Sequence, residues 1–352
     1  MSRADRLVAL IEERELDCLL VNDLVNVRYL TGFTGTNGAC LVGRDERLFF
    51  TDFRYVERAA AEVEGFERVK AGRGLLGEVA GRFHGRTGFD DANLSVRRHR
   101  QLEDEAPEGV ELVAAGGLVE RLRATKDEGE LRAMEAAADI AGSAYELVRE
   151  RGLAGRTERE VAAEMVRHME AQGAEGVSFP PIVAAGPNGA LPHAEARDVE
   201  IPSGTLVVID MGARVDGYCS DCTRTLATGP LDDDALEVYE LVRRAQEEAL
   251  AAARPGAVRR EVDGVARRMI EAAGHGERFG HGLGHGVGLQ VHEEPYLASS
   301  AEGELAPGNT VTIEPGVYLP GAFGVRIEDL VVVTGDGPRA LTGFPKELVT
   351  VD

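Results

Sequence analysis

Residues 157–173 and 259–274 of this chain have similar sequences, TEREVAAEMVRHMEAQG and RREVDGVARRMIEAAG, at an offset of 101 positions. Seven residues match, among them Val161 with Val262 and Gly173 with Gly274. Each segment is followed, some 30 to 40 residues later, by two strand-like runs that carry two acidic residues, at 205–227 and 309–334. Because one such unit cannot bury its apolar face alone, the pattern predicts a duplicated unit of helices and a hairpin, packed into one domain with a site between its halves.

The length of the chain predicts a second domain. A chain of 352 residues exceeds the size at which a single core keeps growing. Helix-like and strand-like segments alternate in its first part, and a long charged helix follows near 119–150, so we place the boundary close to Arg123–Asp127. We therefore expect an α/β (α+β) protein with an α/β domain at 1–125 and the duplicated domain at 126–352.

Charge and cysteine content narrow the function classes. The formal net charge is −22, and no basic run offsets it, so we expect no nucleic-acid or anionic-membrane partner. Charges interrupt every apolar stretch near the N-terminus, which indicates a cytoplasmic protein. Four cysteines do not make a disulfide framework. Cys219 and Cys222 form a CxxC motif, which is typical of a redox site or of one half of a zinc site. Because the sequence has no second CxxC, we interpret both cysteines as small strand residues.

The first strand pair places two acids on one face. Asp216-Gly217 is a strong hairpin signal, and a two-residue turn there sets Asp210 opposite Thr223 and Gly212 opposite Asp221. Asp210 and Asp221 then become diagonal neighbours with backbones about 7 Å apart. Their repulsion calls for a positive charge between them. The alternative is a half-solvated hairpin with exposed acids, against which the apolar run before Asp210 argues.

The second strand pair repeats this arrangement. Glu314 has the parity of Thr310 and Thr312, opposite to that of the apolar residues between them, and Glu328 likewise alternates with apolar neighbours. Two more acids therefore point away from the apolar side.

The segment GHGLGHGVGLQVHEEP (280–295) adds a nitrogen ligand. Each of its alternate glycines would destabilise a helix by about 1 kcal/mol, so the segment is predicted to be a strand. The glycines then share one face of the strand, and because they have no side chains, another backbone can approach that face. His285 lies on the other face. A glycine-rich sheet crossing with stray core histidines is the alternative. Four acids and one histidine form a hard, oxygen-rich set, which suits a pair of Mn, Co, Zn or Fe ions that activate water for hydrolysis.

Five segments in this order resemble the M24 metallopeptidases of pita-bread fold, and within them the proline-specific branch of aminopeptidase P and prolidase. The segments are GxxxxPHxE (Gly186 to Glu195), IDMGARVDGYCSDCTRT, GLGHGVGLQVHEEP, TIEPGVY and GVRIED. The stretch LLVNDLVNVRYLTGFTGTNGACLV is similar to the creatinase-type N-terminal domain. The resemblance implies two divalent metal ions per subunit, most often Mn²⁺ with Co²⁺ or Zn²⁺ as alternatives, a homodimer, and small proline-containing peptides as substrates.

The resemblance also implies residue roles. Asp210 would bind one metal ion, Asp221 and Glu328 would bridge both, and His285 and Glu314 would bind the other. Glu314 would also act as general base. His193 and His292 match histidines that steady the scissile carbonyl and relay protons, and His281 and Arg326 match positions that line the substrate pocket.

Tyr296 bears on the choice within the branch. Some similar prolidases carry a basic residue shortly after the equivalent of His292, for the free carboxylate of a dipeptide. Tyr296 lies in that stretch here, which contains neither Arg nor Lys. The sequence therefore favours aminopeptidase P over prolidase, although a basic residue of the N-terminal domain or of a partner subunit could supply the charge. A non-catalytic peptide-binding homologue and a metal-free, creatinase-like hydrolase of guanidino compounds are more distant alternatives.

Overall fold

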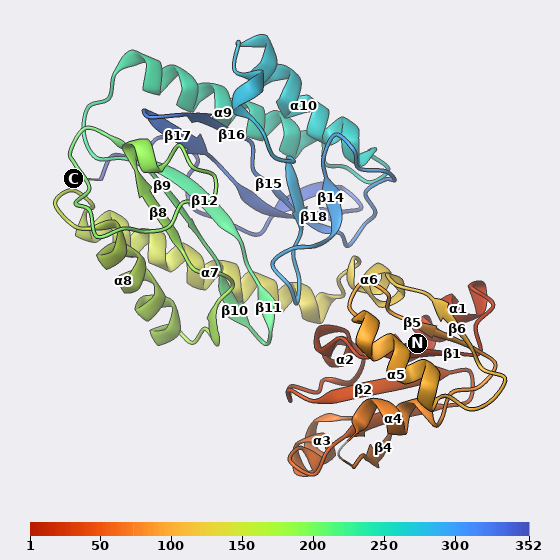
Figure 1. Ribbon diagram of the computed structural model, residues 1–352. Coiled ribbons are helices and arrows are strands. Elements are labelled where there is room, and N and C mark those ends of the chain that lie inside the picture. The colour runs from red at the N-terminus through yellow and green to blue at the C-terminus, as the bar shows by residue number, and fades with distance from the viewer. Residues whose placement is uncertain (73, 352) are drawn as a thin grey trace. The chain divides into compact units, whose positions relative to one another are not determined.

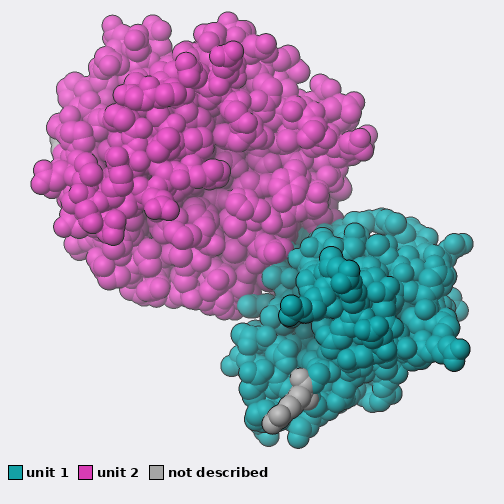
Figure 2. Space-filling model, in the orientation of Figure 1, with its two compact units in different colours: residues 1–123 teal, residues 124–352 magenta. Residues whose placement is uncertain are grey.

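The chain divides into two compact units, residues 1–123 and 124–352 (Figure 2). The computed structural model describes residues 1–72 and 74–351. Within these described ranges, no helix is both long enough and apolar enough to cross a lipid bilayer.

The first unit is a mixed sheet with helices around it (Figure 1). Its strands are β1 (Cys18–Val21), β2 (Gly38–Gly43), β3 (Arg47–Thr51), β4 (Glu67–Lys70), β5 (Arg86–Phe89) and β6 (Glu111–Ala114). Its helices are α1 (Arg3–Glu13), α2 (Leu24–Thr31), α3 (Val56–Glu62), α4 (Leu75–Ala80), α5 (Val96–Glu105) and α6 (Leu118–Arg123). The strand order is β4-β3-β2-β1-β5-β6, and the apolar strand β1 is buried along its whole length at the centre. Helix α1 begins with a capping box at Ser2 and buries Leu7 and Ile11, which are spaced for one helix face.

The second unit has two halves, as the repeat predicts. The first half contains α7 (Glu128–Arg151), α8 (Glu158–Ala171), β7 (Gly176–Val177), β8 (Ile182–Ala185), η1 (Gly186–Asn188), β9 (Leu206–Met211), β10 (Ala213–Val215), β11 (Tyr218–Cys219) and β12 (Cys222–Ala227). The second half contains α9 (Asp233–Ala252), α10 (Arg259–Ala272), η2 (Gly276–Arg278), β13 (Gly284–Gly286), β14 (Glu293–Leu297), β15 (Thr310–Ile313), β16 (Gly316–Leu319), β17 (Phe323–Arg326), β18 (Asp329–Thr334) and β19 (Gly337–Ala340).

The matching helices α8 and α10 begin at Glu158 and Arg259, which confirms the predicted offset. In Figure 1, α7 and α8 cover one side of the strands of this unit, and α9 and α10 cover the other side. Helices α9 and α10 pack into one core, mainly with strands of the second half, and α7 and α8 pack into another, mainly with strands of the first half. A smaller third cluster joins the start of α7 to β11 and β18. The strands between the cores form the sheets β12-β9-β8 and β14-β13-β15-β18-β19, with β16-β17 as a separate hairpin.

The predicted hairpin register is confirmed. Val215 pairs with Tyr218 across the Asp216-Gly217 turn, and Asp210 pairs with Thr223. Asp216 has a positive φ of 48°, as the first position of this turn type requires. In the second half Ile313 pairs with Asp329, and Gly316 pairs with Arg326 beyond it. Glu314 and Glu328 therefore lie opposite each other where one strand pair passes into the next.

The glycine-rich segment departs from one prediction and confirms another. The strand is limited to Gly284–Gly286, with a register irregularity, so the longer strand predicted from the alternate glycines is wrong. Leu283 is buried in the core of α9 and α10, and Val287 is buried in the smaller cluster at the start of α7. The close approach of a second backbone is confirmed. A Cβ at Gly284 would lie 1.9 Å from the carbonyl oxygen of Thr312.

Candidate active site

A cavity of about 520 Å³ in the second unit brings together all the residues that the sequence singles out for a site. Its walls come from both halves, from β8, β9 and the residue before β12 on one side, and from β13, β14, β17 and the residues that follow β15 and β17 on the other. The lining includes Asp210, Asp221, His285, Glu314, Glu328, His193, His292, His281, Arg326 and Tyr296.

Three carboxylates of this cavity are buried, at Asp210, Asp221 and Glu328. Burial raises the pKa of Asp221 well above its ordinary value, and the neighbouring carboxylates of Glu328 and Asp210 raise it further. Burial followed by the charges of Glu314 and Asp210 raises the pKa of Glu328 in the same way. Among the residues that the structure describes, the buried Oδ1 of Asp210 and Oε1 of Glu328 have no hydrogen-bond partner. Repelling acids with unpartnered oxygens are what a cation would neutralise.

His285 is oriented as a metal ligand would be. Its Nδ1 lies 3.1 Å from the carbonyl oxygen of Gly286, so an Nδ1–H donates there and Nε2 faces the carboxylates. That Nε2 is 3.2 Å from Glu314 Oε1 and 3.7 Å from Asp221 Oδ2. Ligand atoms of Asp221, His285 and Glu328 all lie within 4.8 Å of one another. The donor set fits divalent cations that prefer oxygen with one imidazole.

Glu314 remains ionised in this environment. Burial acts to raise its pKa, but the hydrogen bond and charge of His285 outweigh burial, and the pKa of Glu314 falls to about 2. The hydroxyl of Thr312 donates to Glu314 Oε1 at 2.9 Å and also accepts a hydrogen bond from the backbone N–H of His285. One threonine therefore holds both residues in place.

Arg326 is committed to protein partners. Its guanidinium donates to Asp210 Oδ2 at 2.7 Å, to Thr223 Oγ1 at 2.9 Å and to the hydroxyl of Tyr318 at 2.9 Å. Thr223 in turn donates to Glu328 Oε2 at 2.6 Å. Thr223 and Tyr318 were not among the site residues predicted from the sequence, although the predicted hairpin register placed Thr223 opposite Asp210.

The other three histidines differ in position. His281 is half-buried, and its Nε2 lies 3.0 Å from the Tyr318 hydroxyl. Because Arg326 must donate to that hydroxyl, the hydroxyl donates to His281. His292 is exposed at the cavity edge, and its ring centroid lies 4.3 Å from that of His285. A non-strand segment from Gly288 to His292 brings it to this face. His193 is also exposed.

Two ion pairs that were not predicted from the sequence support the exposed histidines. Glu158 accepts hydrogen bonds from the backbone N–H of Ala185, from the amide of Asn188 and from Arg197, and so fixes both ends of the loop that carries His193. Lys126 Nζ lies 2.7 Å from Glu293 Oε1, and Glu293 directly follows His292 in the sequence. Both side chains of this second pair are almost fully buried.

Apart from Glu195, the rest of the wall is mainly apolar. Phe179, Pro180, Ile182, Val291 and Ala298 line it. Tyr296 is 44% exposed at the rim. Among the described lining residues, Arg326 is the sole arginine or lysine, and its contacts direct it to Asp210 and Tyr318. The arrangement can activate water beside a small apolar pocket.

Comparisons with known proteins agree with this geometry. Residues 132–335 match Metallopeptidase family M24, and residues 3–125 match the Creatinase/Prolidase N-terminal domain. The Xaa-Pro dipeptidase of Pyrococcus furiosus is 35% identical over 99% of each chain. Two solved structures, the Xaa-Pro dipeptidase from Bacillus anthracis and the X-Pro aminopeptidase from Thermotoga maritima, superpose with TM-scores of 0.96 and 0.91. The Bacillus anthracis protein is 38% identical to this chain, and the match covers 99% of both chains. The Thermotoga maritima protein is 35% identical, and the match covers 100% of both chains.

Proposed function

Because the chain belongs to metallopeptidase family M24, with a Creatinase/Prolidase N-terminal domain ahead of a pita-bread catalytic domain, we propose that it is an Xaa-Pro dipeptidase. Such an enzyme hydrolyses a dipeptide whose second residue is proline. The observation that carries the proposal is the cavity where the carboxylates of Asp210, Asp221, Glu314 and Glu328 meet the Nε2 of His285. The small apolar wall beside them suits a proline ring.

The five residues are proposed to hold two divalent ions, with Mn²⁺ favoured by the oxygen-rich ligand set and Co²⁺ or Zn²⁺ as alternatives. Asp221 and Glu328 would bridge, Asp210 would belong to one ion, and His285 and Glu314 to the other. Ions held there would supply an activated water and polarise the scissile carbonyl. The unpartnered buried oxygens of Asp210 and Glu328 support this assignment.

The remaining chemistry is assigned to the side chains themselves. Glu314 accepts the proton of the attacking water as general base, held by the hydroxyl of Thr312. His193 and His292, at the cavity edge, steady the scissile carbonyl and pass a proton to the leaving proline nitrogen. Burial and the neighbouring His285 lower the pKa of His292, so that it is neutral at neutral pH and can accept or donate through its ring nitrogens. His281 and Arg326 line the pocket.

The comparisons support the dipeptidase alternative better than the aminopeptidase P that Tyr296 favours. Relatives named Xaa-Pro dipeptidase match both domains over nearly the full length. Aminopeptidase P remains the second candidate, because the described cavity wall contains no uncommitted Lys or Arg for a dipeptide carboxylate and because the Thermotoga maritima relative is an X-Pro aminopeptidase. As a dipeptidase, the enzyme needs a basic group from elsewhere in the chain or from a partner subunit.

Substrate length decides between these candidates. The protein is stripped with a chelator, supplied with Mn²⁺, and assayed on Ala-Pro and Ala-Pro-Ala. Preference for Ala-Pro supports the dipeptidase, and preference for the tripeptide makes the enzyme an aminopeptidase P. Peptide binding without cleavage of either would instead identify a non-catalytic homologue. The homodimer and the cytoplasmic location stay predictions, and sedimentation velocity tests the homodimer.

A further inference from the structure

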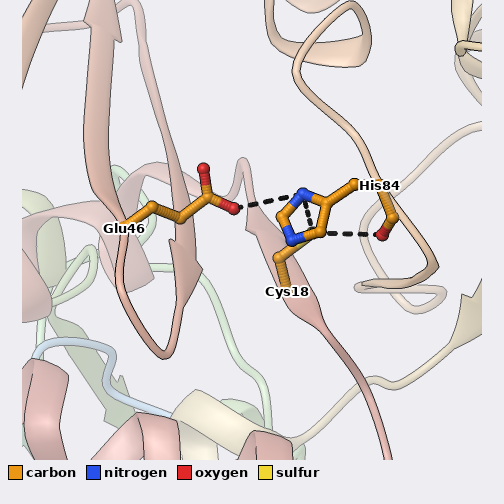
Figure 3. Close-up of side chains that lie close together, drawn as sticks. All are labelled: Cys18, Glu46 and His84. Atoms are coloured by element: carbon orange, nitrogen blue, oxygen red, sulfur yellow. Dashed lines mark hydrogen bonds and ion pairs between the residues drawn. The ribbon is translucent and has the colours of Figure 1, made fainter.

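A second group of metal-ligand side chains lies in the first unit, apart from the residues of the cavity. Cys18 opens β1, Glu46 lies in the turn between β2 and β3, and His84 lies in the loop before β5 (Figure 3). One ligand atom of each residue lies within 4.8 Å of the other two. Segments distant in sequence therefore bring a thiol, a carboxylate and an imidazole to one point.

Hydrogen bonding explains only part of these contacts. Cys18 Sγ lies 3.3 Å from Thr87 Oγ1, which is a buried hydrogen bond, but the contacts of His84 are more numerous than its donors. His84 Nδ1 lies 3.4 Å from Glu46 Oε1, 4.0 Å from Cys18 Sγ and 3.4 Å from the carbonyl oxygen of Arg82. A single imidazole N–H can donate well to only one of these three atoms. The Oε1 atom of Glu46 is buried and, within the described part of the chain, makes no hydrogen bond. Its burial raises the pKa of Glu46 above its ordinary value.

The two distances from His84 Nδ1 to the other ligand atoms are close to those of a tetrahedral zinc site, and the sulfur and the carboxylate oxygen lie within 4.8 Å of each other. Bonds of about 2.3 Å to sulfur and about 2.0 Å to nitrogen or oxygen place two tetrahedral ligand atoms about 3.3–3.6 Å apart. The imidazole-to-carboxylate distance of 3.4 Å already agrees. The imidazole-to-sulfur distance of 4.0 Å needs a contraction of a few tenths of an ångström, which the His84 loop can make because that side chain is 54% exposed.

We propose that Cys18, Glu46 and His84 form a second cation site, for a borderline-soft divalent ion such as Zn²⁺, that is separate from the catalytic cavity. Thiolate and imidazole are the ligands that select zinc over Mn²⁺ or Mg²⁺. Glu46 and His84 also line a hollow of about 500 Å³. Its other charged residues are Glu12, Asp17, Asp45 and Arg44, of which Arg44 pairs with Glu12, so the hollow has an excess of acidic side chains that favours a cation.

Binding has a defined proton balance. Burial raises the pKa of the Cys18 thiol, so the sulfur carries its proton in the absence of a cation. Coordination forms the S–Zn bond, breaks the S–H bond and releases that proton to solvent. The ion would tie the β2–β3 turn and the His84 loop to the start of β1.

Co²⁺ distinguishes this site from the catalytic one. The proposed catalytic ligands contain no sulfur, so only a cysteine ligand produces thiolate-to-cobalt charge-transfer absorption in the near ultraviolet. The full-length protein, kept reduced and metal-free, is titrated with Co²⁺ and then with Zn²⁺. We expect this absorption in the wild type and its loss when Zn²⁺ displaces Co²⁺.

Variants identify the ligands. Cys18→Ser should abolish the absorption, and His84→Ala should weaken Co²⁺ binding at this site by more than about tenfold, because even outer-shell partners of a metal contribute 10–100-fold. Cys40→Ala is the matched control, since Cys40 is a buried free cysteine of the same unit outside the cluster. Ala-Pro hydrolysis should be unchanged in all three variants. Lack of the absorption in the wild type, or its persistence in Cys18→Ser, overturns the proposal, and the exposed His84 keeps the test decisive if Cys18→Ser does not fold.

Discussion

Thr223 shows how single residues organise the candidate site. Its hydroxyl donates to Glu328 and accepts from Arg326, and Arg326 reaches on to Asp210. Thr223 is fully buried, so no water can replace these hydrogen bonds without a rearrangement. A side chain without a charge thus links a carboxylate of the second half to a carboxylate of the first.

Substitution of this threonine tests the link. Thr223→Val keeps the shape but removes the hydroxyl, which frees an oxygen of Glu328 and one donor of Arg326. We expect Mn²⁺ affinity, measured by titration of the metal-free protein, to fall about 10–100-fold. Thr223→Ser restores the hydroxyl and should stay within a few-fold of the wild type. Equal affinities in the valine and serine variants would show that the hydroxyl has no role.

At the scale of elements, the strand β13 depends on a glycine where two backbones meet. A Cβ at Gly284 would lie 1.9 Å from the carbonyl oxygen of Thr312, whereas a Cβ at Gly280 meets nothing within 4 Å. Thr312 also forms hydrogen bonds with Glu314 and His285, so a displacement of its backbone would move both of these site residues.

We expect Gly284→Ala to lower the free energy of unfolding by about 1–3 kcal/mol, the usual cost of overpacking. Gly280→Ala is the control and should change it by less than about 0.5 kcal/mol. Urea denaturation of the two variants and the wild type measures the difference. A Gly284→Ala protein as stable as Gly280→Ala would contradict the close packing of β13 against β15.

The elements also show what the sequence can predict. The Asp216-Gly217 turn and the two-residue period of strands fix the register, so the shared face of Asp210 and Asp221 followed by counting. The longer strand predicted for the glycine-rich segment did not form, because β13 ends after three residues and the residues on its two sides enter different cores. The ion pair of Lys126 and Glu293 joins residues 167 positions apart, and no local pattern signals such a pair.

For the whole molecule, the central acids should make stability depend on metal and pH together. The pKa values of Asp221 and Glu328 are raised above their ordinary values of 3.8 and 4.5. A folded group with a raised pKa keeps protons that the unfolded chain has lost, so the metal-free protein loses stability as the pH rises past those values. A cation that replaces the protons reverses this loss.

Mn²⁺ should therefore raise the Tm more at about pH 8 than at about pH 5, where protons compete for the same carboxylates. Thermal unfolding with Mn²⁺ and with chelator, at both values, measures the shifts, and Asp221→Asn should reduce them. A shift that is as large at the lower pH would mean that Mn²⁺ acts elsewhere.

Hydrolysis of Ala-Pro by the chelator-stripped protein, before and after Mn²⁺ is restored, tests the metal-dependent dipeptidase most directly. The geometry of the cavity predicts no measurable turnover without metal, recovery with Mn²⁺, and no recovery in Glu314→Gln, which lacks the proposed base. Turnover that survives complete metal removal, or an Ala-Pro bond that stays intact with every divalent ion, would contradict the assignment.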